Sequence, residues 1–125
     1  MKTDARKECY EEQENRLYTV GEIGTLLGIS RKTLFYYDHI GLLKPSARTG
    51  TQAFKVYDSQ SVRKLQRIIH LQACGLKLSE IRRIMEAPQE TALILEKAMA
   101  RLEQEKKELL MKMTNLQVLI EKQNQ

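Results

Sequence analysis

The chain has 125 residues, which is enough for one compact domain plus one extended element but too short for two full domains. Its hydrophobic content is 42% and its formal net charge is +5 at pH 7. The excess is local, because residues 19 to 72 carry eight Lys or Arg against three Asp or Glu, whereas residues 86 to 125 carry six against seven. A positive field confined to one segment is typical of a site for a polyanion, although ordinary surface solubility accounts for the net charge equally well.

The two cysteines exclude several classes of protein. Cys9 and Cys74 have no second Cys or His at ligand spacing, which argues against a structural zinc site and a disulfide framework.

No apolar stretch approaches the roughly 18 residues of a membrane helix, and the charged N-terminus is unlike a signal peptide. We therefore expect a reduced, cytoplasmic protein with no cofactor, no metal and no membrane contact.

The N-terminal segment differs from the rest of the chain. Residues 1 to 16 alternate charge signs with hardly any apolar residues, which predicts a flexible extension. Thr19 and Glu22 then form a T-x-x-E capping box, which predicts a helix from about Val20.

A turn separates this helix from the next one. Gly28 is typical of a left-handed residue that ends a helix, and Ser30 is placed to cap a second helix running to about Ile40. Two short helices joined by Gly-Ile-Ser predict a helix-turn-helix, in which we expect Ile29 to be buried.

The segment LLKPSARTGTQAFKVYD combines turn residues with strand formers. It predicts a small β-hairpin, the wing, that closes near Tyr57. Asp58 then caps a third helix, which Gly75 ends, and a fourth helix follows from Leu78 to about Glu86, with Lys77 a poor cap. The residues expected to be buried on these two helices are Val62, Leu65, Ile69 and Ala73, then Leu78, Ile81, Ile84 and Met85.

From Pro88 to Gln125 the chain contains neither Gly nor a further Pro, which predicts one long helix. Its seam residues are spaced alternately four and three apart, as in a coiled coil. They are Leu95, Met99, Leu102, Lys106, Leu109, Met113, Leu116 and Ile120. A helix on the order of 50 Å long cannot bury such a stripe against one small head, so we expect a second copy as its partner, with Lys106 a polar break that helps fix register. A solitary solvated helix is the alternative.

The second helix of the helix-turn-helix has two chemically different faces. A helical wheel of residues 30 to 40 places Thr33, Leu34 and Tyr37 inward, Arg31, Lys32, Phe35 and His39 outward, and Tyr36 at the margin. Cations beside an aromatic ring suit the DNA major groove, because Arg reads guanine edges or holds phosphate, Lys neutralises phosphate and Phe packs on a thymine methyl. A solvated helix start and core tyrosines explain each residue singly, but they explain an exposed Phe beside two cations less well.

At this point the motifs YTVGEIGTLLGISRKTLFYYDHIGLLKPSAR, FKVYD and LQRIIHLQACGLKLSEIRRIM resemble MerR-type transcription regulators across about residues 18 to 87. The resemblance implies a mainly α fold, with a winged helix-turn-helix domain over 17 to 87 and an antiparallel coiled-coil dimerisation helix over 88 to 125. It also implies a homodimer on a pseudo-palindromic site in double-stranded DNA, RNA polymerase as a partner at the promoter, and regulation by DNA distortion.

The resemblance implies, further, that Arg31, Lys32 and Thr33 enter the major groove, that Tyr36 and Tyr37 contact phosphate or support such contacts, and that the wing contributes Arg48 and Lys55. The candidate DNA-contact set is Thr19, Arg31, Lys32, Thr33, Phe35, Tyr36, Tyr37, His39, Arg48 and Lys55. Family members commonly have Arg where this chain has Phe35 and Lys55, so charge is lost at the first position and a forked donor at the second.

Several other roles are not expected. Metal-sensing members of the family carry Cys ligands around the dimerisation helix, whereas this chain has no Cys beyond Cys74, which we expect to be a small buried residue. His39 and His70 are isolated, and no nucleophile–base pair or phosphate loop indicates an enzyme. Two alternatives remain, a DNA-bending protein of the architectural or recombination-directionality kind and an adaptor that recruits another chain through the coil. The effector stays open.

Overall fold

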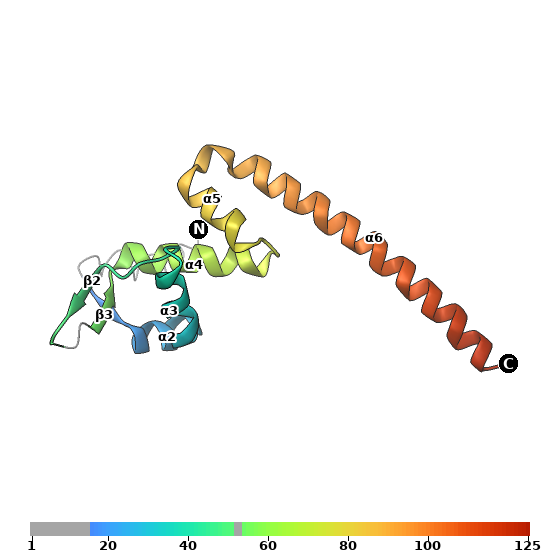
Figure 1. Cartoon of the computed structure of the whole chain (residues 1–125), viewed down its shortest axis with the longest axis horizontal. Helices are drawn as coiled ribbons and strands as arrows, with labels where there is room; N and C mark the ends of the chain where they lie inside the picture. Colours follow the sequence, from blue (N-terminus) through green and yellow to red (C-terminus); the bar gives the residue numbers. More distant parts are fainter. Residues whose placement is uncertain (1–15, 52–53) are drawn as a thin grey trace, which may run out of the picture. The chain divides into compact units, whose positions relative to one another are not determined.

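The computed structural model describes residues 16–51 and 54–125, which form two compact units that divide between Cys74 and Gly75. The first unit holds, in chain order, β1 (Tyr18–Thr19), α2 (Val20–Leu27), α3 (Arg31–His39), β2 (Ala47–Thr49), β3 (Phe54–Tyr57) and α4 (Ser59–Ala73) (Figure 1). The second holds α5 (Leu78–Glu86), the 3-10 turn η1 (Pro88–Glu90) and α6 (Thr91–Gln123). The extension expected over residues 1 to 16 lies outside the described residues, apart from Arg16.

The helix-turn-helix forms as its caps predict. The Glu22 backbone N–H donates to Thr19 Oγ1 at 3.1 Å, and the Thr19 N–H donates to Glu22 Oε1 at 3.0 Å. Gly28, with a φ of 69°, ends α2, and Ser30 Oγ caps α3 by accepting from the Thr33 N–H at 3.0 Å. The expected burial of Ile29 is wrong, because a groove of about 380 Å³ leaves this half-buried side chain open on one side.

The wing is part of a three-stranded antiparallel sheet in the order β1-β3-β2. The hairpin of β2 and β3 was expected, but β1 was not, because two residues are too few to show a strand period. Tyr18 pairs with Tyr57, and Thr19 pairs with Val56. The short strand therefore ties the start of α2 to the wing.

The core of the first unit gathers apolar side chains from all of its helices and from two of its strands. Its buried members are Tyr18, Val20, Ile23, Leu34, Tyr37, Leu42, Leu43, Val56, Tyr57, Val62, Leu65 and Ile68. On α4 Val62 and Leu65 are buried as expected, but Ile68 is buried in place of Ile69, which is half-buried, and Ala73 is exposed. Two adjacent isoleucines straddle the apolar stripe, and the helical period does not decide which one faces inward.

Cys74 is exposed rather than buried, because it caps α4 beyond the last buried turn. In the second unit Ile81 and Ile84 are buried as expected, but Leu78 and Met85 are only half-buried, since they flank the narrow buried stripe of a nine-residue helix. The chain from Pro88 begins as a 3-10 turn, so α6 starts later than expected.

The second unit is held by contacts around the start of α5. Lys77 makes no side-chain cap, and its backbone N–H instead donates to Glu80 Oε1 at 2.8 Å. The Arg101 guanidinium from α6 pairs with the same carboxylate at 2.9 Å and donates to the Gly75 carbonyl at 3.2 Å. Hydrogen bonds from Arg101 and from the Lys77 backbone lower the pKa of Glu80.

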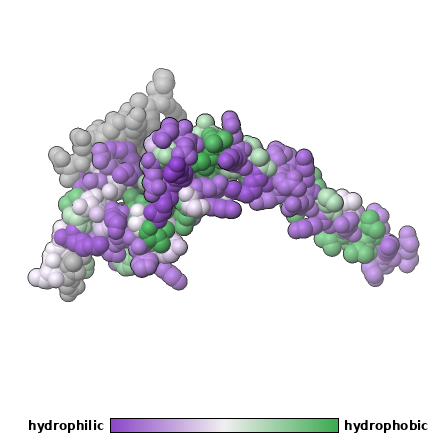
Figure 2. Space-filling view, turned by 45° about the horizontal axis from the view of Figure 1, so that its top comes forward, coloured by the Kyte–Doolittle hydropathy of each residue, from purple (hydrophilic) through white to green (hydrophobic). Residues whose placement is uncertain are grey.

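The long helix α6 is exposed along most of its length. Ala98 is buried, but every residue from Leu102 to Gln125 is exposed. Figure 2 shows apolar surface in green interspersed with polar surface along this helix. An amphipathic helix of this length therefore leaves its apolar stripe uncovered within one chain.

A first prediction concerns the cap of α4. Asp58 Oδ1 accepts from the Ser61 backbone N–H at 2.8 Å, and this hydrogen bond lowers the pKa of Asp58. We expect Asp58→Ala to reduce the free energy of unfolding by about 1 kcal/mol, whereas Asp58→Asn keeps most of the cap. Because the folded pKa is depressed, the carboxylate's contribution is present above the unfolded pKa and is lost as pH falls through the folded one. Denaturant unfolding at one protein concentration measures both variants, and equal stability of the two at neutral pH would contradict the assignment.

Candidate nucleic-acid interface

The two faces of α3 lie as the helical wheel predicts. Leu34 and Tyr37 are buried, whereas Arg31, Lys32 and Phe35 are exposed. Tyr36 and His39 are also exposed, and Thr33 is half-buried beside the Ser30 cap. The outward face is therefore cationic at its N-terminal end and aromatic in its middle.

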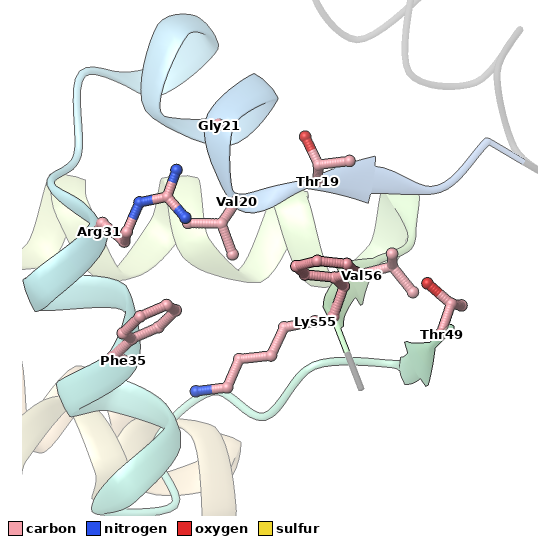
Figure 3. Close-up of a pocket in the computed structure, with 9 residues that line it drawn as sticks. Thr19, Val20, Gly21, Arg31, Phe35, Thr49, Lys55 and Val56 are labelled. Carbon is pink, nitrogen blue, oxygen red and sulfur yellow. The ribbon is translucent and has the colours of Figure 1, made fainter. Parts of the chain in front are cut away.

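A groove of about 540 Å³ runs between the outward face of α3, the start of α2 and the wing (Figure 3). It brings together four members of the candidate DNA-contact set that are far apart in sequence. Those four are Thr19, Arg31, Phe35 and Lys55, and the other lining residues are Val20, Gly21, Thr49, Phe54 and Val56. The mixture of cations, hydroxyls and apolar side chains matches the phosphates, sugars and methyl groups of a DNA duplex.

Phe35 has a defined partner in the wing. The Lys55 ammonium lies 4.0 Å from the centroid of the Phe35 ring, and Figure 3 shows the lysine reaching from β3 toward the helix. A cation over an aromatic face is attracted by the ring quadrupole. Phe35 is still 39% exposed, so part of the ring stays available to a ligand. Phe35 and Lys55 therefore form one contact between α3 and the wing.

Asp38 links the same lysine to a second wing cation. Its Oδ2 atom lies 2.9 Å from Lys55 Nζ and accepts a hydrogen bond from Arg48 at 3.3 Å. Arg48 and Lys55 are direct cross-strand partners on β2 and β3, an arrangement in which like charges repel. Burial alone raises the pKa of Asp38, but the two cations more than offset this, so its pKa lies below the ordinary value. Asp38 therefore stays ionised and joins the wing to α3.

The candidate cations fall into two groups. Arg48 and Lys55 share the carboxylate of Asp38, whereas Arg31 and Lys32 form no ion pair within residues 16–51 and 54–125. The positive charge at the N-terminal end of α3 is thus uncompensated, while that of the wing is partly compensated.

The tyrosines of the candidate set differ in their surroundings. Tyr36 is 50% exposed, but Tyr37 is buried and its hydroxyl donates to the Gln72 side chain. Of the two roles expected for Tyr37, burial favours support of the helix over direct contact with phosphate.

Tyr57 of the wing is not in the candidate set. Burial, together with the charge of Asp38, raises the pKa of Tyr57 to about 12, so its hydroxyl stays neutral.

Sequence reasoning missed two members of this site. Phe54 is 62% exposed and lines the groove, whereas the sequence indicates only that it favours a strand. Asp38 has no role in the sequence prediction. A signal for it exists, because Glu22 and Asp58 serve as helix caps and Asp38 is the remaining acid between residues 19 and 72.

In the part of the chain that the structure describes, no three His, Cys, Asp or Glu side chains lie in a group that could hold a metal ion. None of its helices is both long and apolar enough to cross a membrane.

A family model described as MerR HTH family regulatory protein matches residues 18–88. The nodulation protein NolA of Bradyrhizobium elkanii is 35% identical over 88 residues, which are 70% of this chain and 40% of NolA. The HTH-type transcriptional regulator SkgA of Caulobacter vibrioides is 38% identical over 72 residues, 58% of this chain and 28% of SkgA. The chain thus spans less than half the length of these relatives.

A solved structure covers more of the chain. The N-terminal part of Mta, the multidrug transporter activator of Bacillus subtilis, has a TM-score of 0.69 and 27% sequence identity. The alignment covers 82% of this chain and 97% of that structure. The mainly helical fold with a small wing and a long C-terminal helix is therefore confirmed.

A second prediction tests the link between α3 and the wing. Asp38→Asn keeps the shape of the side chain but leaves Arg48 and Lys55 facing each other without a counter-charge. We expect it to lower the free energy of unfolding, and Lys55→Met to relieve part of that loss in the double variant. A double-mutant cycle by denaturant unfolding should give a coupling energy of about 0.5 to 2 kcal/mol that shrinks in high salt. Additive losses would contradict the link. Since the folded pKa of Asp38 is depressed, the coupling is present above the unfolded pKa and is lost as pH falls through the folded one.

Proposed function

The chain belongs to the MerR family of helix-turn-helix regulatory proteins, and from this premise we propose that it binds a pseudo-palindromic promoter site as a homodimer and regulates transcription by distorting the DNA. The observation that carries the proposal is the groove of about 540 Å³, in which α3 and the wing present Arg31, Phe35 and Lys55 together. RNA polymerase at the promoter is the partner that such regulation requires.

We assign the base-reading role to the exposed face of α3. Arg31 and Lys32 stand at its N-terminal end, which in helix-turn-helix proteins meets the base edges first. Arg31 has the forked donor geometry that reads guanine, and Lys32 is a point charge suited to phosphate. The exposed part of Phe35 offers an apolar surface to a thymine methyl group.

The wing receives a positioning role. Arg48 is nearly half exposed and can reach a phosphate while Asp38 still holds it, whereas Lys55 is only 23% exposed by side chain. A cation that is shared with a carboxylate contributes less to the electrostatic part of DNA affinity than a free one. We therefore expect the wing to fix the orientation of the head on the duplex more than to supply affinity.

The homodimer is supported by the exposure of the α6 stripe. Heptad spacing places four apolar side chains on one face of the helix, and each is more than half exposed. They are Leu109, Met113, Leu116 and Ile120. Removing such side chains from water contributes roughly 25 cal/mol per Å² of apolar surface, and a second copy of the same helix offers a matching face.

Distortion follows from the rigidity of such a dimer. Two heads joined by a coiled coil keep a set separation, whereas the major groove of straight B-DNA returns to one face every ~34 to 36 Å. Heads that do not match this repeat must bend or untwist the duplex at a cost of about 1 to 6 kcal/mol, which phosphate contacts can offset.

A third prediction concerns the head of α3. Arg31→Ala should weaken binding by about 1 to 3 kcal/mol and relax specificity at one base position, because a bidentate base contact is lost. Lys32→Ala should weaken all DNA about equally and lower the salt slope by roughly one unit. Binding to a selected site and to random DNA is measured by fluorescence anisotropy across salt.

The matched control is Lys107→Ala, which removes the same charge from α6, outside the head. It should leave both the affinity and the salt slope unchanged. Wild-type binding by both α3 variants across the salt range would overturn the assignment of α3.

A fourth prediction addresses the mechanism. Promoters whose spacers are lengthened or shortened by single base pairs are transcribed with and without the protein, and circularly permuted probes report bending. We expect activation confined to an overlong spacer together with a measurable bend, because distortion is useful only where the promoter elements are misaligned. Repression that ignores spacer length, with no bend, would indicate a steric repressor instead.

A further inference from the structure

The uncovered stripe of α6 carries charges that discriminate between ways of pairing it. The seam residues Leu95 and Ile120 mark its two ends, and Lys106 interrupts it near the middle. We propose that the antiparallel pair of α6 helices, which the family resemblance implies, takes one register, set by Glu105 of each chain and Lys112 of the partner subunit, with Lys106 of one chain level with Leu109 of the other. This inference rests on the proposed homodimer and specifies its interface.

The first argument is the matching of seam residues. In an antiparallel coiled coil each first-position seam residue lies level with a fourth-position seam residue of the other helix. In the proposed register, two residues that lie level with each other have residue numbers that add up to 215. Every seam residue of one copy therefore meets a seam residue of the other. The four pairs are Leu95 with Ile120, Met99 with Leu116, Leu102 with Met113, and Lys106 with Leu109.

The second argument is the charge on one flank of the seam. In an antiparallel pair, the same flank of each helix lies beside its copy in the other helix. In this register Glu105 and Lys112 of the partner subunit are offset by only about 3 Å along the helix axis. The two-fold symmetry makes this opposite-charge pair occur twice. Both side chains are exposed, and neither forms an ion pair within the described part of its own chain.

The neighbouring registers lose both features. A slide of one heptad in one direction brings Glu105 against Glu105 of the partner subunit, and a slide in the other direction brings Lys112 against Lys112 of the partner subunit. Either slide also leaves two of the eight seam residues of each chain without a seam partner. A parallel pair places Lys106 against Lys106 of the partner subunit at the seam, where like charges repel.

The third argument is the local environment of Lys106. Its ammonium lies 3.0 Å from Glu103 Oε2 on the same helix, on the flank opposite to Glu105. Facing Leu109 of the partner subunit, the lysine can keep this pair while its methylenes cover the leucine. In this register Lys106 is therefore tolerated at the seam, whereas opposite a second lysine it would be repelled.

Charge variants test the register. Glu105→Lys and Lys112→Glu each turn two attractive pairs into two repulsive ones, and we expect each to weaken the dimer about tenfold. The double variant Glu105→Lys/Lys112→Glu restores both pairs and should return to wild-type affinity. Subunit exchange between differently labelled copies measures this. Single variants that bind like the wild type would overturn the register, because in both shifted registers each single change is neutral: a like-charge pair stays like-charged when both copies carry the change.

Cysteine crosslinking gives an independent readout, in a chain whose Cys9 and Cys74 are replaced by Ser. Neither Leu102→Cys nor Met113→Cys should form a covalent dimer alone, but a mixture of the two should. The matched control is a mixture of Met99→Cys and Leu109→Cys, which crosslinks only after a one-heptad slide. Crosslinking of the control mixture, or of a single variant alone, would overturn the proposal. The mass of the wild type in solution distinguishes a failure of the proposed homodimer from a failure of the proposed register. A monomer refutes the homodimer itself, whereas a dimer with the wrong crosslinks refutes only the register.

Discussion

The carboxylate of Asp38 is the constraint on which the candidate DNA-binding surface depends. It lies between α3 and the two wing strands, and it is the counter-charge for Arg48 and Lys55, which face each other across the hairpin. Without it the hairpin would hold two like charges side by side, and the wing would lose its ion pairs to α3. The cation–π contact between Lys55 and Phe35 strengthens the same junction. One buried acid thus pairs with Lys55, a residue that lines the groove, and links the wing to α3.

This arrangement separates affinity from orientation. Arg31 and Lys32 keep their full charge because no acid within the described residues pairs with them, so they are suited to gain energy from phosphate and base edges. The wing cations share one carboxylate, so in the proposed DNA complex they contribute less to the electrostatic part of the affinity. Phe35 carries no charge, and its contact with Lys55 adds to the link between α3 and the wing.

The helix-turn-helix could be predicted from the sequence because its determinants are local. The capping box of Thr19, the left-handed Gly28 and the Ser30 cap each act within four residues, and all three form as expected. Contacts made by folding could not be predicted. The strand β1 exists only because Tyr18 and Thr19 meet residues of β3, and Asp38 finds its partners across a hairpin. The choice between Ile68 and Ile69 likewise depends on what packs against α4.

The long helix presents the converse case, because its period is legible in sequence while its partner lies outside the chain. Apolar spacing indicates that a second helix is needed but leaves its direction and register open. In the proposed pair, the charges of Glu105 and Lys112 select one register. A slide of one heptad would move the two helices by about 10 Å relative to each other. Three base pairs of B-DNA span nearly the same distance, at 3.4 Å of helix axis each. An error of one heptad in the coil would therefore change the half-site spacing that the two heads can reach, and flanking charges that reject it protect the choice of operator.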